Sequence, residues 1–331
     1  MVNIHLDNID RQLVNLTQVD FPLTREPYKD LGLRLDISED QVLRRIEQLR
    51  VKGIIRQISP VFDARALGYQ TTLVAIRVPE GQMDKAERLI NQHPRVSHGY
   101  ERAHQFNIWF TLAFPNTSDA ETEVQRLTSP MGAEAVLTLP AVKVFKIGAY
   151  FDMDGDTQST AGTVTQPNST LSQKAELSQT DKLIINAVQQ DLPLVSEPFG
   201  AIAAQLNMDV EILAAECRSL QQRGIMRRFG AAVNHNMAGF KANAMACWIA
   251  SPSEVDIIGQ KLSSLREVSH CYERKPNSLW PYNLFAVIHG RQRKTCQEIA
   301  AGVSRETGMT DYVLLFSTKE FKKIRVRYEV I

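Results

Sequence analysis

Over the first 65 residues, apolar side chains recur at the three- and four-residue spacing of amphipathic helices. Helices are expected over Leu6–Val19, around Tyr28–Leu33 and from Ser38 to Gly53. Ser38 followed three residues later by Gln41 is a capping-box pattern, which indicates where the third helix begins. Ile54–Ser59 and Pro60–Phe62 are expected to form the two arms of a wing. Residues 1–65 are therefore predicted to be a winged helix-turn-helix.

From residue 66 to residue 151 the pattern changes to short apolar runs separated by two amphipathic helices. Strands are expected at Gln70–Val78, Val96–Arg102, Asn107–Phe114 and Ala135–Ile147, and helices at Met83–Gln92 and Ser118–Leu127. This β-α-β-β-α-β order is that of a ferredoxin-like domain, in which both helices cover one face of an antiparallel sheet. The other face is left free for a ligand or for a second sheet.

The whole plan is then repeated after a polar segment. Residues 152–174 contain mainly Gly, Ser, Thr, Gln, Pro and Asn, and we expect a flexible linker because so few apolar side chains cannot offset the entropy lost on ordering. Beyond it, landmarks such as Gly53 recur with an offset of 171 residues, here as Gly224. A second winged helix-turn-helix is placed at residues 175–236 and a second αβ domain at 237–331. The predicted fold class is α+β, with the two halves forming an intramolecular pseudo-dimer.

One stretch occurs in both halves almost unchanged. Val96–Arg102 reads VSHGYER and Val268–Arg274 reads VSHCYER, so that only Gly99 and Cys271 differ. In a strand, alternate residues share a face. One face would carry His98, Tyr100, Arg102 and, if the strand continues, His104; the other would carry Ser97, Gly99 and Glu101. Such a row suits a large anionic ligand that needs a proton, whereas the alternative is a half-buried strand whose polar groups are hydrogen-bonded internally.

Composition narrows the setting in which the chain works. The 38 basic and 37 acidic residues leave a net charge of +1, which argues against a dedicated nucleic-acid binder. The four cysteines, at positions 217, 247, 271 and 296, form no CxxC pair, and neither a disulfide framework nor a metal site is expected. The N-terminal residues lack a signal-peptide pattern, and no apolar run is long enough for a membrane span. A cytoplasmic protein is therefore expected.

The architecture resembles that of the Lrp/AsnC transcription regulators, but the repeated segments resemble another family. VSHGYERAHQFNIWFTL and VSHCYERKPNSLWPYNLF are similar to the two signature segments of siroheme decarboxylase, whose paired, Lrp-like subunits are fused in some organisms. The resemblance covers nearly the whole chain apart from the linker. It implies non-oxidative removal of two acetate carboxylates, at C12 and C18, to give 12,18-didecarboxysiroheme for haem d1 or alternative haem b synthesis. The iron would belong to the substrate, and no further cofactor is implied.

The resemblance also suggests roles for individual residues. Arg102 and Arg274 would bind substrate carboxylates, the alternative being an ion pair within the chain. His98 and His104 would supply protons, because histidine titrates near neutral pH. Pro276 replaces the second histidine in the other half, so that the halves are expected to be unequal. Substrate contacts are expected from Tyr100, Trp109, His270 and Tyr272. Further cations could line the rim, although a solvated strand edge explains most of them better; they are Lys143, Lys146, Lys322, Lys323, Arg325 and Arg327.

A regulator, which could respond to haem, is the competing hypothesis. Its recognition helix would be Gln41–Lys52, which carries four basic residues, whereas the equivalent Val210–Arg223 is less basic. Two such unequal helices would match palindromic half-sites poorly. Further homo-oligomerisation is compatible with either hypothesis.

Overall fold

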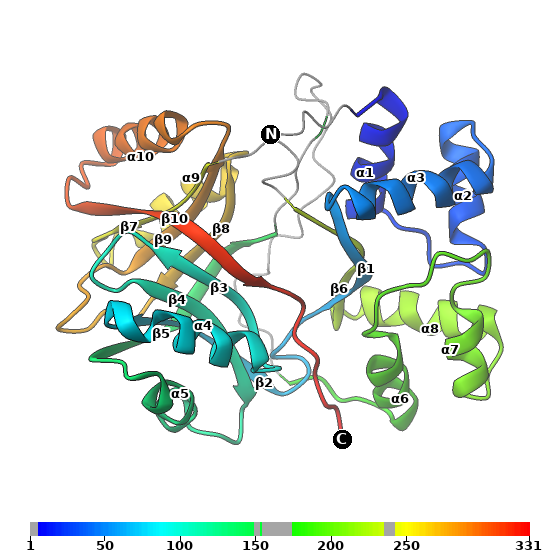
Figure 1. Ribbon diagram of the computed structural model, residues 1–331, viewed down its shortest axis with the longest axis horizontal. Helices are drawn as coiled ribbons and strands as arrows, with labels where there is room; N and C mark the ends of the chain where they lie inside the picture. Colours follow the sequence, from blue (N-terminus) through cyan, green and yellow to red (C-terminus); the bar gives the residue numbers. More distant parts are fainter. Residues whose placement is uncertain (1–5, 149–152, 154–173, 235–241) are drawn as a thin grey trace.

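The computed structural model describes residues 6–148, 153, 174–234 and 242–331. The predicted linker at 152–174 lies outside the described residues except for Met153 and Lys174. Two layers are visible in Figure 1, with an αβ barrel on one side and the helix-turn-helix units on the other. The segment after the last strand runs between them toward the C-terminus. Within the described residues no helix is both long enough and apolar enough to cross a membrane.

Both helix-turn-helix units have the predicted three helices. In the first half these are α1 (Asn8–Val19), α2 (Pro27–Leu35) and α3 (Glu39–Val51), and in the second half α6 (Gln179–Val188), α7 (Gly200–Gln205) and α8 (Val210–Gln222). The capping box predicted at the start of α3 is present, with Ser38 and Gln41 bonded to each other's backbone N–H groups. Apolar faces of both units join in one hydrophobic core. The two units therefore form one continuous layer.

The prediction of a two-armed wing is wrong. Ile55–Phe62 is a single strand, β1, and it pairs antiparallel with β6 (Met226–Val233) from the other half. The two arms were expected to divide between Ser59 and Pro60, but in a two-stranded ribbon a proline can lie on an unpaired edge without disrupting a ladder. The ribbon formed by β1 and β6 connects the two halves between the helical layer and the barrel.

Each αβ domain has the expected ferredoxin-like plan. The first contains β2 (Tyr69–Arg77), α4 (Met83–Gln92), β3 (Val96–Arg102), β4 (Ile108–Pro115), α5 (Ala120–Thr128) and β5 (Ala135–Ile147), with short 3₁₀ turns at Glu80–Gln82 and Ser129–Met131. The second contains β7 (Ala242–Trp248), α9 (Val255–Ser264), β8 (Val268–Arg274), β9 (Leu284–Gly290), α10 (Arg293–Thr307) and β10 (Tyr312–Lys323). The helices lie outside the strands (Figure 1).

The two sheets join edge to edge. Strand order is β10-β3-β4-β2-β5-β8-β9-β7, and β7 pairs with β10 to close the barrel. The halves meet at two antiparallel seams, β3 with β10 and β5 with β8. One end of the barrel is filled by apolar residues from both halves, including Phe106, Trp109, Trp280 and Phe285. The predicted pseudo-dimer is thus a single closed barrel.

The one difference between the repeated motifs has a packing explanation. A Cβ atom at Gly99 would overlap the ring of Phe321 on the neighbouring strand. In the second half the space is divided differently, since Phe145 lies over Gly259 of α9 and the motif position is occupied by Cys271. In the first half the ring of Phe321 packs on a glycine of the motif strand, whereas in the second half the ring of Phe145 packs on a glycine of the helix.

Candidate functional site

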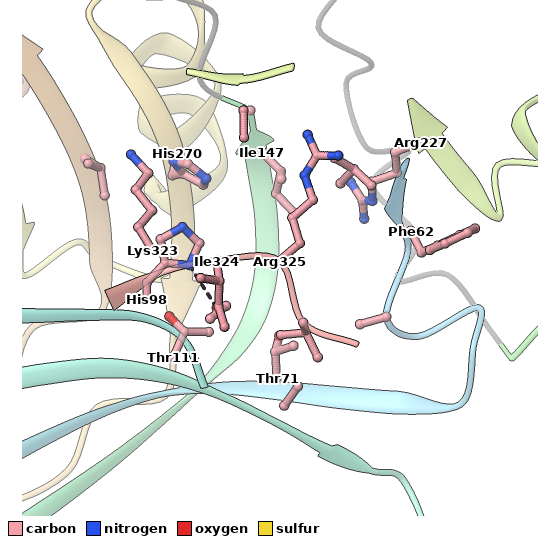
Figure 2. Close-up of a pocket in the computed structure, with 18 of the residues that line it drawn as sticks. Phe62, Thr71, His98, Thr111, Ile147, Arg227, His270, Lys323, Ile324 and Arg325 are labelled. Atoms are coloured by element: carbon pink, nitrogen blue, oxygen red, sulfur yellow. Dashed lines mark hydrogen bonds between the residues drawn. The ribbon is translucent and has the colours of Figure 1, made fainter. Parts of the chain in front are cut away.

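A cavity of about 740 Å³ lies between the β1–β6 ribbon and the barrel. Its walls come from both halves, from β1 and β6 on one side and from the barrel strands on the other. The segment Ile324–Tyr328 contributes further lining between them. Figure 2 shows His98, His270, Lys323 and Arg325 gathered in this space. A volume of this size is within the range of ligand and cofactor sites, about 300–1,000 Å³.

The repeated motif supplies two matching rows of side chains. His98, Tyr100 and Arg102 line the cavity from β3, and their second-half equivalents line it from β8. Within the first row the histidine and tyrosine rings stack with centroids 6.5 Å apart, and the Arg102 Cζ lies 5.4 Å from the tyrosine ring centre. The corresponding values in the second row are 6.2 and 4.7 Å. Since β3 and β8 are four strands apart in either direction around the barrel, the rows lie on opposite walls.

Ser97 was expected to point away from this face, and the structure corrects that. The pairing of β3 with β4 shifts register between Val96 and His98, as in a β-bulge. The irregularity brings the Ser97 hydroxyl to 2.8 Å from His98 Nδ1, and both residues line the cavity. The same shift in β8 places Ser269 Oγ 2.9 Å from His270 Nδ1. Bulges commonly re-aim side chains beside active sites.

His104 does not belong to the row. Strand β3 ends at Arg102, and the chain then turns so that the His104 N–H donates to the Arg102 carbonyl at 2.8 Å. The His104 ring contacts Trp280 edge-on with centroids 5.5 Å apart, and it is absent from the cavity lining. The predicted pairing of His98 with His104 on one face is therefore wrong. The histidines that share the cavity with His98 are His270 and His289, both from the other half.

Arg102 and Arg274 are buried, with 5% and 8% of their surfaces exposed. Each donates across a seam to the opposite half, Arg102 Nη1 to the Leu315 carbonyl and Arg274 Nη1 to the Leu139 carbonyl, both at 2.6 Å. Neither forms an ion pair within the described chain, so the expected alternative of an internal salt bridge is wrong. Burial lowers the pKa of each guanidinium to about 10. A buried cation without a counter-ion is costly, which indicates an anionic ligand.

Six further cations line the cavity, giving eight against two carboxylates, Asp20 and Asp63, among the described residues. They are Arg56, Arg65, Arg227, Arg228, Lys323 and Arg325. Arg56 pairs with Glu320 on β10, and Arg227 pairs with Asp63 at 2.6 Å. Arg228 and Arg325 bind only carbonyl and hydroxyl oxygens and form no ion pair with a described carboxylate. Burial lowers the pKa of Arg325 to about 9.

The predicted rim cations divide into two groups. Lys323 and Arg325 line the cavity, whereas Lys143, Lys146, Lys322 and Arg327 are absent from its lining. Lys143 pairs with Asp256, and buried Lys322 donates to three carbonyls at the end of α4. Four further lining cations were not predicted from the sequence, namely Arg56, Arg65, Arg227 and Arg228. The 171-residue offset between Arg56 and Arg227 could have identified that pair.

Several other predicted contacts are in place around the cavity. Tyr100 and Tyr272 line it beside their arginines, and Trp109 forms part of the lining while its Nε1 donates to the Phe106 carbonyl at 2.7 Å. Burial, followed by the positive charge of Lys323, lowers the pKa of His270 to about 4 in the ligand-free cavity. Within the described ranges no cluster of three His, Cys, Asp or Glu side chains could hold a metal ion.

Two of the four cations of the expected recognition helix, Arg45 and Arg50, form ion pairs within the protein. Arg45 binds Asp7 and Asp10 at 2.8 and 2.6 Å, and Arg50 binds Asp191 of the other half at 2.9 Å. The helix N-termini are also covered, since Glu39 of α3 accepts from Ser196 at 2.9 Å. At the start of α8, Asp209 and Glu211 pair with Arg25 from the first half. Because base contacts come mainly from the N-terminal residues of a recognition helix, this arrangement argues against DNA reading.

Comparisons with known proteins agree with both layers of the structure. The family described as "AsnC-like ligand binding domain" matches residues 66–146 and 237–322, and "Siroheme decarboxylase NirDL-like HTH domain" matches 10–56 and 181–227. The chain is 35% identical over 318 residues to siroheme decarboxylase of Hydrogenobacter thermophilus, covering 96% of this chain and 94% of that one. It is 30% identical to the siroheme decarboxylase NirDL subunit of Paracoccus denitrificans, covering 96% of each.

A solved structure matches at the level of the whole fold. The crystal structure of siroheme decarboxylase NirDL in complex with an iron-uroporphyrin III analogue aligns with a TM-score of 0.70 and 33% identity. The alignment covers 97% of this chain and 95% of that one.

Proposed function

The chain belongs to the siroheme decarboxylase family, and we propose that it is a carboxy-lyase that converts siroheme to 12,18-didecarboxysiroheme. The observation that carries the proposal is the charge of the cavity. Arg102, Arg228, Arg274 and Arg325 line it without any ion pair to a described carboxylate. Siroheme presents eight carboxylates around its rim, and guanidinium–carboxylate pairs are among the stronger charge-assisted hydrogen bonds in proteins. The Lrp-like regulator is not favoured.

Substrate binding would fill the space between the ribbon and the barrel. The two arginines at the ends of the repeated rows reach into the barrel, while Arg228 and Arg325 reach the same space from β6 and the C-terminal segment. The flat macrocycle would lie between the two rows, with its side chains directed toward these cations. That a related siroheme decarboxylase has been crystallised with an iron-uroporphyrin III analogue supports a tetrapyrrole as the ligand.

The chemistry needs one proton for each carbon dioxide released. When the bond from the acetate methylene to its carboxylate breaks, the electron pair left on carbon takes a proton and a methyl group results. Of the three histidines that line the cavity, His98 and His270 could give this proton through Nε2, because Nδ1 of each is bonded to a serine, whereas Nε2 of His289 is itself bonded to Ser269. A positioned acid contributes about 10²–10⁴ in rate. His104 has no part in this proposal.

The ligand itself would prepare His270 for that role. Burial and nearby cations lower the pKa of His270 to about 4, so that without a neighbouring anion the imidazole is neutral near pH 7. Substrate carboxylates that pair with Lys323, Arg228 and Arg274 would offset those charges. The pKa of His270 would then rise, and the imidazolium form would be populated when substrate is bound. The product would serve haem d1 or alternative haem b synthesis.

Anaerobic incubation with siroheme, followed by mass analysis of the tetrapyrrole, tests the proposal. Loss of two carbon dioxide masses without an added oxidant is the expected result. His104→Ala serves as the matched control, because this histidine lies outside the cavity and its variant is expected to retain turnover. A tetrapyrrole recovered unchanged, together with salt-dependent binding to duplex DNA, would overturn the enzyme and favour the regulator.

A further inference from the structure

Behind His270 lies a buried hydrogen-bond chain. Ser269 Oγ is 2.9 Å from His270 Nδ1 and 2.8 Å from Nε2 of a third histidine, His289. Ser269 and His289 are only 5% and 7% exposed. The Ser269 Oγ also lies 3.4 Å from the Val287 carbonyl, a longer contact. A serine hydroxyl has a single proton, so it can donate to only one of these neighbours, and it leaves Nδ1 of His270 protonated unless it donates to that atom. The orientation of this one O–H therefore determines where the proton of His270 lies.

The first half has no third member. His289 occupies a β9 position whose N–H donates to the Glu267 carbonyl, and the same backbone bond in β4 is made by Ala113 to the Arg95 carbonyl. An alanine methyl cannot accept a hydrogen bond. Among the described residues Ser97 is thus hydrogen-bonded through its side chain only to His98. The two rows therefore differ in what lies behind the serine, which is a histidine in the second half and an alanine in the first.

The reaction chemistry selects one direction of donation for the hydrogen bonds that link His270, Ser269 and His289. A histidine that gives up its Nε2 proton must keep a proton on Nδ1, since otherwise it would become an imidazolate. If Ser269 donates to His289 Nε2, its oxygen accepts the His270 Nδ1–H, and proton transfer from Nε2 leaves a neutral imidazole. The cations around His270, namely Lys323, Arg228, Arg274 and Lys146, make neutral histidines favourable in the resting cavity. In this direction Ser269 and His270 each have the donor or acceptor that they need, and the proton of a neutral His289 lies on Nδ1.

The two rows also match the two reacting groups. Around rings C and D of siroheme the side chains read acetate at C12, propionate at C13, propionate at C17 and acetate at C18. This order is symmetric about the carbon bridge between the two rings. The protein rows are likewise related by the duplication and lie on opposite walls of one cavity. A single bound siroheme could therefore present one acetate to each row.

We propose that His289, acting through Ser269, is a positioning residue that holds His270 in the Nδ1–H form, so that His270 serves one acetate and His98 the other. The inference rests on the proposed function and deepens it. In the step itself, the methylene–carboxylate bond breaks, carbon dioxide leaves, and the Nε2 proton of the His270 imidazolium passes to the methylene carbon. His270 is left neutral, and a solvent proton restores it. His289 gives up no proton and touches no reacting atom.

Product analysis tests the division of labour. His289→Ala should slow one of the two losses of carbon dioxide by roughly 10² or more, so that a singly decarboxylated tetrapyrrole accumulates. Ser269→Ala should give the same isomer, and the double variant should be little worse, because residues that act as a unit are not additive. His289→Gln places an acceptor near the lost Nε2 and should restore much of the rate. Ser97→Ala is the matched control and should not produce that isomer.

Spectroscopy separates this inference from the proposed function. ¹⁵N spectra of histidine-labelled, ligand-free protein, assigned with His270→Ala, should show the neutral His270 proton on Nδ1 and a mixture of both forms in His289→Ala. A proton on Nε2 in the wild type would overturn the inference, as would unaltered product ratios in His289→Ala. Loss of siroheme affinity that Gln fails to restore would assign His289 to direct substrate contact and also overturn it. A wild type that releases no carbon dioxide would instead sink the proposed function.

Discussion

Replacing Arg102 by methionine should stabilise the ligand-free protein or leave its stability unchanged, and should weaken siroheme binding. The guanidinium is buried and forms no ion pair with a described carboxylate, and burial lowers its pKa from 12.5 to about 10. Because this base has a folded pKa below its unfolded value, folding disfavours the charged form, and near pH 7 the folded state bears the whole cost. At 1.36 kcal/mol for each pKa unit, the cost is about 3 kcal/mol.

Part of that gain is lost with the hydrogen bond. Arg102 Nη1 donates to the Leu315 carbonyl at 2.6 Å, and leaving a carbonyl without a donor costs about 1–3 kcal/mol. The net expectation is a free energy of unfolding between the wild-type value and about 2 kcal/mol above it. Binding loses a charge-assisted hydrogen bond of about 1.5–3 kcal/mol, which corresponds to roughly ten- to a hundredfold in affinity.

Two measurements on one protein preparation decide the matter. Urea denaturation without ligand gives the free energy of unfolding, and anaerobic absorbance titration with siroheme gives the affinity. Arg77→Met is the control, since this residue makes an exposed pair with Glu134 at 3.0 Å and its loss should change stability by no more than about 0.5 kcal/mol. A variant that loses more than about 2 kcal/mol while binding siroheme normally would refute the reasoning and make Arg102 a structural tie between the halves.

Three other outcomes are expected. His104→Ala should retain near-wild-type turnover, whereas His98→Ala should lose about 10²–10⁴ in rate, as measured by anaerobic mass analysis. Equal losses in the two variants would support the original prediction that His98 and His104 act together. Gly99→Cys should lower the free energy of unfolding by about 1–3 kcal/mol through overlap with the Phe321 ring, and Phe321→Leu in the same chain should recover part of it. Burial lowers the pKa of Lys323 to about 8, so the lysine loses its charge as pH rises through that value; siroheme affinity should fall above pH 8, and Lys323→Met should abolish this dependence.

Local patterns were enough to predict the elements and their duplication. The capping box of Ser38 and the helical stripes depend on residues three or four positions apart, and the structure has them where expected. Strand pairing between the halves could not be predicted in this way. The division of the wing at Pro60 was wrong because the residue that pairs with Pro60, Phe229 on β6, is remote in sequence. The two barrel seams are likewise formed by backbone hydrogen bonds between strand edges. Every sequence has the same backbone groups, so the sequence does not show which edges will pair.

The residues of the site were predicted correctly where β3 keeps the regular two-residue alternation of a strand. Two-residue alternation correctly grouped His98, Tyr100 and Arg102, but it could not show the bulge that turns Ser97 inward. It also extended the row to His104, because nothing in a single sequence shows that the strand ends before that residue. The missed cations come from the ribbon and from loops. They reach the cavity only because distant elements pack together.

Closure of the barrel has a consequence for how the chain acquires its structure. When the first half leaves the ribosome, β3, β4, β2 and β5 can form their own sheet, but its two edge strands, β3 and β5, must wait for β10 and β8. Unpaired strand edges are templates for association with other chains. Contacts between residues so far apart in sequence also slow folding, because a long loop must close before it is stabilised. The seam between β3 and β10 pairs Arg102 with Ser317, a residue made more than 200 positions later. Truncation of the C-terminal strand would therefore leave an open sheet edge as well as an incomplete cavity.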